Sequence, residues 1–138
     1  MTVVLNPYIG FLKEARAAME FYRDVFGGEL LISTFADFQA SVEPDEQDLV
    51  MHSVLTTPNG LTLMGSDTPS HNDYKPGTNI SISLSGDDDA ALHGYFDKLA
   101  DGGTVSQPLV AAPWGDSFGM VTDKFGITWL VNITAAAS

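Results

Sequence analysis

The chain contains no cysteine and few basic residues. Without thiols it cannot form a disulfide, a zinc–thiolate site or a cysteine nucleophile, which fits a reducing compartment. Six lysines and arginines stand against 18 acidic residues, and the resulting net charge of −12 should repel phosphate backbones and anionic membranes. We therefore expect neither nucleic acids nor membranes as partners.

Long hydrophobic runs are also missing. No apolar stretch approaches the roughly 20 residues that span a bilayer, and the first residues form no basic leader. A cytoplasmic protein is the expectation. With 138 residues, 44% of them hydrophobic, the chain is long and apolar enough for a single domain with its own core.

A turn near the end of the chain has a weaker copy in the first half. Residues 122–130 read TDKFGITWL and residues 57–64 read TPNGLTLM, which aligns Gly126 with Gly60. A second pair, FYRDVFGG at 21–28 and FDKLADGG at 96–103, marks two amphipathic helix ends closed by Gly-Gly. The repeat predicts an α+β fold of two tandem βαβββ modules, about 1–67 and 77–134, within the single domain 1–138.

Residue periodicity places the elements of these modules. Helices are predicted over Ala15 to Phe26 and after the acidic triplet Asp87 to Asp89, whose carboxylates should act as helix caps rather than as ligands. The predicted strands lie at residues 3–10, 30–35, 49–56, 61–66, 79–85, 105–110, 118–122 and 127–133. A polar, acidic loop over 36–48 and a connector over 67–77 complete the prediction.

The acidic residues outside the helix start lie mainly in loops. We expect them to keep the surface soluble, because none occupies a strand position that would line an interior. Attraction of a cationic ligand is the alternative. Asp123 and Lys124 fall at a hairpin, where turn chemistry explains them without a site.

Three segments resemble the vicinal oxygen chelate superfamily, which includes glyoxalase I, bleomycin-resistance proteins and extradiol dioxygenases. They read FYRDVFGGEL, GTNISISLSGDD and PWGDSFGMVTDKFGITWLVN, and the resemblance, to the PhnB-like branch in particular, spans about Leu5 to Asn132. That branch is often labelled by similarity to demethylubiquinone methyltransferase, although no glycine-rich nucleotide fingerprint is found here. The resemblance implies a curled, mostly antiparallel eight-stranded cup that binds its ligand on the inner face, usually in a homodimer.

The resemblance also implies where a metal would bind. Metal-dependent members place His, Gln or Glu on the cup face of the first, fourth, fifth and eighth strands, positions that correspond here to Asn6, Met64, Ser81 and Leu130. Two of these residues are apolar and two offer weak neutral oxygens, whereas a divalent site needs converging imidazoles or carboxylates. Shifting each position by one residue introduces no His, Asp or Glu. We therefore predict no catalytic metal at the usual place, and no cofactor.

His52 is a titratable residue on a predicted strand that could face the cup. An imidazole there could act as a general base at neutral pH. A tight hairpin at 57–60 would instead place His52 with Leu61 and Leu63, under a helix. A hydrogen-bonded structural role is the favoured interpretation and catalysis by His52 is the alternative.

Trp114 lies in a predicted loop beside Pro113, Gly115 and Asp116. An exposed loop aromatic is a common anchor for a planar ligand, but Trp114 could equally plug the mouth of its own barrel half or a dimer seam. Both interpretations stay open. The residues predicted to bind the ligand are Asn6, Tyr8, Met64, Asn79, Ser81, Trp114, Phe118 and Leu130.

Two functions of different classes follow. The first is a binding protein that holds a small cationic or aromatic molecule in a metal-free cup. The second is a lyase, isomerase or dioxygenase with an unrecognised metal site or with His52 as its base. A dimeric scaffold with a vestigial pocket is a third possibility. The lack of metal ligands favours the first.

Overall fold

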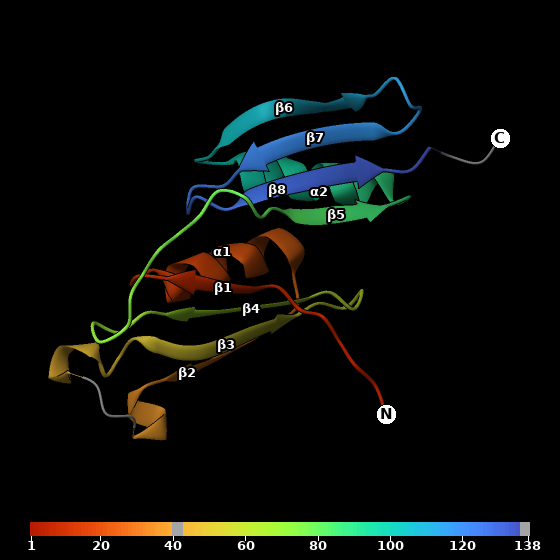
Figure 1. The fold of residues 1–138 in the computed structure, drawn as a ribbon. Helices are drawn as coiled ribbons and strands as arrows, with labels where there is room; N and C mark the ends of the chain where they lie inside the picture. Colours follow the sequence, from red (N-terminus) through yellow and green to blue (C-terminus); the bar gives the residue numbers. More distant parts are fainter. Residues whose placement is uncertain (40–42, 136–138) are drawn as a thin grey trace. The chain divides into compact units, whose positions relative to one another are not determined.

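The structure, a computed structural model, describes residues 1–39 and 43–135. Backbone contacts divide the chain into two compact units, Met1–Pro76 and Gly77–Ser138. Each unit has the order strand, helix, three strands (Figure 1). The predicted α+β plan of two tandem βαβββ modules is therefore confirmed, and the boundary falls inside the predicted connector.

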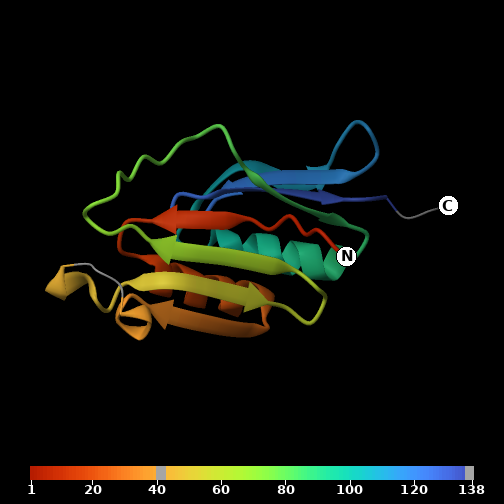
Figure 2. The same ribbon diagram turned by 60° about the horizontal axis from the view of Figure 1, so that its bottom comes forward.

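The first unit is a mixed sheet with one helix on it. Its elements are β1 (Tyr8–Phe11), α1 (Ala15–Phe26), β2 (Glu29–Thr34), η1 (Ala36–Phe38), η2 (Pro44–Glu46), β3 (Val50–Thr56) and β4 (Thr62–Asp67), where η marks a 3-10 turn. The strand order is β1-β4-β3-β2, with β1 parallel to β4 and the other pairs antiparallel. Figure 2 shows these strands side by side with α1 behind them.

The second unit repeats this arrangement. Its elements are β5 (Ile82–Gly86), α2 (Asp89–Ala100), β6 (Thr104–Ala111), β7 (Ser117–Thr122) and β8 (Thr128–Ile133). The strand order is β5-β8-β7-β6, with β5 parallel to β8. The strand register is repeated as well. Tyr8 lies opposite Met64 in the first sheet, and the residues equivalent to them in the second unit, Ser83 and Leu130, also lie opposite each other.

Helix α1 packs on its sheet through one apolar stripe. Its buried residues follow the three- and four-residue spacing of a helix face, and they are Ala15, Ala18, Met19, Tyr22, Val25 and Phe26. The helix ends at Gly27, which adopts a φ of +75° that other residues rarely reach. At the other end, the buried Asp67 carboxylate accepts hydrogen bonds from Ala15 N (2.9 Å) and Val50 N (2.9 Å). Asp67 thereby joins the starts of α1 and β3.

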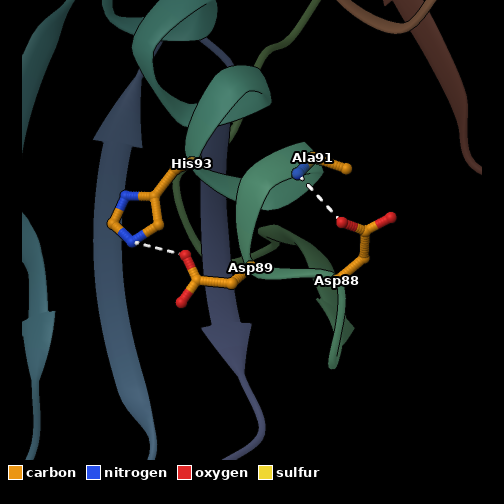
Figure 3. Close-up of polar contacts among 4 residues, drawn as sticks. All are labelled: Asp88, Asp89, Ala91 and His93. Atoms are coloured by element: carbon orange, nitrogen blue, oxygen red, sulfur yellow. Dashed lines mark hydrogen bonds and ion pairs between the residues drawn. The ribbon is translucent and has the colours of Figure 1, made fainter.

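Helix α2 covers the second sheet with Leu92, Phe96 and Leu99. Figure 3 shows its first turn, where the Asp88 side chain accepts a hydrogen bond from Ala91 N at 3.1 Å. The next acid, Asp89, has its carboxylate 3.3 Å from His93 Nε2. The prediction that this triplet caps a helix is confirmed for Asp88.

Three hairpins in the described chain share one turn geometry. In each, the first residue's N–H donates to the carbonyl four residues on, and a glycine N–H donates back to the first residue's carbonyl. The turns run over 57–61, 112–116 and 123–127, and their glycines Gly60, Gly115 and Gly126 have φ values of +88°, +103° and +89°. This is the three-residue loop with a left-handed glycine. Asp123 accepts hydrogen bonds within the last turn from Phe125 N and Ile127 N, which confirms its predicted turn role.

Two strands start three or more residues later than predicted. β1 begins at Tyr8 rather than at residue 3, so Val3 and Leu5 are 99% and 98% exposed; β5 begins at Ile82 rather than at residue 79, and Ile80 is 82% exposed. Strand pairing explains both differences. Neighbouring β4 starts at Thr62 and β8 starts at Thr128, directly after their turns. In the observed registers, residues 3–5 and 79–80 would therefore lie opposite turn residues rather than strand residues.

Candidate functional site

Each sheet has one face that its helix leaves uncovered, which we call its open face. In β8, Trp129 and Val131 are buried on the helix side, so Thr128, Leu130 and Asn132 occupy the open face, as predicted. In β4, Leu63 is buried on the helix side while Met64 lies on the open face. Each open face carries candidate site residues of its own unit.

A pocket of about 360 Å³ lies in the second unit, between β6, β7 and the turn that joins them. Met120 pairs with Leu130 and Phe118 pairs with Asn132, which places the pocket on the open face of this sheet. The lining residues are Gln107, Val110, Ala111, Ala112, Pro113, Trp114, Phe118 and Met120. A cavity of this size is in the range that accommodates small organic ligands.

Trp114 forms one wall of the pocket at the tip of the 112–116 turn. Its ring meets the Phe118 ring edge to face, with centroids 5.9 Å apart, and Trp114 remains 63% exposed. Pro113 fixes the backbone before it, and the hydrogen bonds from Ala112 N to Asp116 O (2.7 Å) and from Gly115 N to Ala112 O (3.0 Å) close the turn. Trp114 therefore lies on a turn whose backbone is held by hydrogen bonds.

The Asp116 carboxylate ties this turn to the end of the sheet. It accepts hydrogen bonds from Ala135 N (3.0 Å) and Asn132 Nδ2 (3.1 Å). The hydrogen bond from the Ala135 N–H has the largest effect on the pKa of Asp116 and that from Asn132 the second largest, and both lower it below its ordinary value. Burial raises the pKa by a smaller amount. Asp116 thus stays ionised and holds the pocket turn against β8.

A bulge brings Gln107 onto the pocket face. The pairing of β6 with β7 shifts between Val110, opposite Phe118, and Gln107, opposite Met120. Strict alternation from Val110 would have turned Gln107 to the helix side, but the irregularity around Pro108 returns it to the open face. Pro108 is tolerated because β6 is an edge strand.

His52 lies on the open face of the first sheet. The loop 58–60 has three residues, so Val54 pairs with Met64 and Leu55 pairs with Leu63. His52 alternates with the buried Ser53 and therefore shares a face with Val54 and Met64. Its placement under the helix with Leu63, expected from a tight hairpin, is wrong.

The neighbour of His52 on this face is Tyr8. Their ring centroids are 6.0 Å apart, and Tyr8 is 52% exposed. Within the described residues, neither the imidazole nor the phenol hydroxyl has a hydrogen-bond partner. His52 therefore lacks, in this part of the chain, the hydrogen bond that the structural interpretation required, and its catalytic role stays a prediction.

The predicted ligand-binding residues fall into three groups. Trp114 and Phe118 line the pocket together, and Leu130 adjoins it through its pairing with Met120. Tyr8 and Met64 pair on the open face of the first sheet. The remaining three lie outside strands, with Asn6 half-buried before β1, and Asn79 and Ser81 exposed before β5.

Sequence reasoning missed six of the residues that line this pocket, which are Gln107, Val110, Ala111, Ala112, Pro113 and Met120. Met120 alternates with Phe118 along a correctly predicted strand, so the same face assignment could have included it. Gln107 and Val110 gave no such signal, because a bulge breaks the two-residue period between them.

The metal positions implied by the resemblance carry no suitable ligands. Met64 and Leu130 lie on the open faces of β4 and β8, whereas Asn6 and Ser81 precede β1 and β5. The open-face residues opposite Met64 and Leu130 are instead Tyr8 and Ser83. A phenol, a thioether, a hydroxyl and an aliphatic side chain do not fit a divalent cation that prefers imidazole and carboxylate. Elsewhere in residues 1–39 and 43–135, no three His, Asp or Glu side chains group as metal ligands.

Membrane insertion finds no support in the helices. Neither α1 nor α2, nor any other helix in the described part of the chain, is long and apolar enough to cross a bilayer.

Comparison with known proteins gives matches over nearly the whole chain. The model of the Glyoxalase/Bleomycin resistance protein/Dioxygenase superfamily matches residues 5–131. Protein YjdN from Escherichia coli strain K12 is 24% identical over 140 residues, covering 94% of each chain.

Solved structures agree with this match. Protein PA1353 from Pseudomonas aeruginosa is 36% identical, with a TM-score of 0.81 over 98% of this chain and 100% of the other. The PhnB protein from Bacillus cereus is 25% identical, with a TM-score of 0.75 over 96% of this chain and 100% of the other.

Proposed function

The chain belongs to the glyoxalase/bleomycin resistance protein/dioxygenase superfamily, and we propose that it is a binding protein that holds a small aromatic molecule in the pocket on β6 and β7. The observation that carries the proposal is the Trp114–Phe118 pair in the wall of that pocket. No metal takes part in the proposed binding.

The pocket suits a flat apolar ligand. Its walls are mainly aliphatic and aromatic, and an aromatic ring inserted beside Trp114 would add stacking to the burial of apolar area. The hydrogen-bonded turn holds Trp114 in place before the ligand arrives, so little ordering cost arises on binding.

Binding without turnover is favoured by the chemistry of the lining. None of the described residues around the pocket has a side chain that titrates near neutral pH. General acid–base catalysis needs such a group within hydrogen-bond reach of the substrate. The pocket supports recognition of a ligand better than its transformation.

Trp114→Ala tests this proposal. With quinoline as the probe and isothermal titration calorimetry as the measurement, we expect binding to weaken about tenfold or more, because one stacking wall is lost. Tyr74→Ala is the matched control, since Tyr74 is an exposed aromatic in the connector and is not among the residues that line the pocket. Equal affinities for wild type and Trp114→Ala would contradict the proposal.

A second candidate function uses His52 as a general base. It is favoured by the position of the His52 imidazole beside the Tyr8 phenol on the open face of the first sheet. Dicarbonyl and catechol compounds are the substrates to assay, with His52→Asn as the variant. Turnover that is equal in both proteins, or absent from both, would contradict this function.

The proposal extends to assembly. We propose that the protein is a homodimer, since apolar side chains such as Leu31 and Tyr8 stay exposed on the open face of the first sheet. Sedimentation equilibrium should give twice the chain mass. A monomer at all concentrations would contradict the dimer.

A further inference from the structure

We infer that this pocket selects uncharged aromatic rings that carry a carbonyl or amide group over cationic rings, and that Gln107 determines the selection. The inference rests on the proposed binding function and specifies its ligand class. It runs against the expectation, drawn from the net charge of −12, that an acidic protein would prefer a cation.

The first observation is the neutrality of the pocket wall. Although the chain has 18 acidic residues, no charged side chain lines the pocket in the described structure. The acid that is nearest in sequence, Asp116, directs its two carboxylate oxygens to Asn132 Nδ2 and Ala135 N. Both of its oxygens thus accept hydrogen bonds from donors at the end of the sheet, and Asp116 is not among the residues that line the pocket.

The second observation is the single hydrogen-bonding amide in the wall. Gln107 faces the pocket beside Met120, and within the described residues its side chain has no hydrogen-bond partner. A side-chain amide offers both a carbonyl acceptor and an N–H donor, so it can pair with a lactam or amide on the ligand through two complementary bonds. Between them, Trp114 and Phe118 would hold the ring of the same ligand.

Two electrostatic effects act on a cationic ligand in opposite directions, and we expect the local one to determine its affinity. Attraction by distant surface acids is screened beyond about 8 Å at physiological ionic strength. The loss of hydration on entering an apolar, uncharged pocket is not offset there by any carboxylate. Long-range attraction would therefore speed the approach of a cation without making its binding tight.

Two probes of similar shape test the inference. They are 2-quinolone, a neutral lactam, and N-methylquinolinium, a permanent cation, each titrated at about 50 mM and about 500 mM salt. We expect the wild type to bind 2-quinolone at least about tenfold more tightly, with an affinity that changes less than about twofold with salt. Equal or tighter binding of the cation would overturn the inference.

Two substitutions test the role of Gln107. Gln107→Glu introduces a charge at the same position and should reverse the preference, with cation binding that weakens as salt is added. Gln107→Leu should weaken 2-quinolone about tenfold while leaving naphthalene, which has no polar group, within about twofold of the wild type. Unchanged selectivity in both variants, with wild-type melting temperatures, would overturn the role of Gln107.

Trp114→Ala separates failure of the inference from failure of the proposed function. If the cation is preferred and its binding weakens in Trp114→Ala, the pocket binds aromatic molecules but the proposed selectivity is wrong. If both probes fail to bind the wild type, or bind Trp114→Ala as tightly, the proposed function and the inference fall together.

Discussion

Asp123 closes the last hairpin with a carboxylate that is only 3% exposed. Its Oδ1 accepts hydrogen bonds from Phe125 N (2.9 Å) and Ile127 N (3.1 Å), and its Oδ2 accepts one from the buried Trp129 Nε1 at 2.8 Å. One residue thus satisfies two backbone donors of the turn and the indole in the core. Buried polar groups without such partners are costly.

Asp123→Ala should therefore destabilise the protein strongly. The indole N–H of Trp129 would be left buried without this acceptor, and we expect the free energy of unfolding to fall by about 2–4 kcal/mol. Urea denaturation followed by circular dichroism measures the change.

Asp97→Ala is the control for this prediction. Asp97 is exposed on α2, so its replacement should change the free energy of unfolding by less than about 0.5 kcal/mol. A similar small loss for Asp123→Ala would show that Asp123 does not support the core.

Asp116 predicts a pH dependence of stability. Because its pKa is lower in the folded protein than the ordinary value of 3.8, its ionised form stabilises the fold above that pH, and this contribution is lost as the pH falls through the lowered pKa. Asp116→Asn should therefore melt at a lower temperature than the wild type at pH 7. The difference should shrink as the pH is reduced below 3.8.

Asp97→Asn removes the same charge without these hydrogen bonds and serves as the reference in thermal melts. A difference between Asp116→Asn and the wild type that stays constant across this pH range would contradict the role given to the carboxylate.

Site residues on strands were predicted only where the local period is regular, whereas Trp114 was predicted from its place in a loop. Phe118 and Leu130 lie on strands with strict alternation, and their faces follow from the sequence. His52 could not be assigned, because its face depends on whether the 58–60 loop contains an odd or an even number of residues. Gln107 was missed because a bulge shifts the pairing of β6 with β7.

At the scale of elements, the passage from helix to strand depends on two close backbone approaches. A Cβ on Gly103 would overlap the Thr122 carbonyl oxygen and lie 3.0 Å from Asp123 Cα. Gly28 holds the equivalent place in the first unit, where a Cβ would overlap the Thr56 carbonyl oxygen. The Gly-Gly pairs that reveal the repeat in the sequence thus leave room for the backbone of the neighbouring hairpin.

Gly103→Ala should lower the free energy of unfolding by about 2 kcal/mol or more, because the added methyl group collides with backbone that cannot move independently. Thermal and urea unfolding measure the effect.

Gly94→Ala is the matched control, since Gly94 lies inside α2 and a Cβ there meets no atom within 4 Å. Alanine favours the helix, so this variant should gain about 0.5–1 kcal/mol. Changes of the same sign in both variants would contradict the steric argument.

Helices were easier to predict than strand starts. Helix α1 has the predicted bounds because the apolar spacing and the glycine that ends it are both local features. The starts of β1 and β5 depend instead on where β4 and β8 begin, far along the chain. Val3 and Leu5 alternate as strand residues do, but in the register of β1 they would lie opposite residues of the 57–61 turn.

At the scale of the whole molecule, the connector between the units carries little structure. Residues 70–80 are all exposed, and the ion pair between Lys75 and Asp73 is at the surface, where such pairs contribute little. The order of elements in the two units was predictable because the second unit repeats the glycines and turns of the first.

Insertion of Gly-Ser-Gly-Ser between Pro76 and Gly77 should be tolerated. Lengthening an exposed connector adds little loop entropy, and we expect the free energy of unfolding to change by less than about 1 kcal/mol. The same insertion between Asn59 and Gly60 would open a hydrogen-bonded turn and should destabilise the protein markedly. Equal losses in the two variants, measured by urea denaturation, would contradict this view of the connector.

The shared three-residue turn also limits how this chain can change length. Directly opposed residues share a face, so adding or deleting a single residue in the 58–60 or 124–126 loop would exchange the two faces of the strand that follows. Trp129 would then turn outward and Leu130 inward. Length variation at these turns should therefore occur in pairs of residues, or together with a bulge that restores the phase.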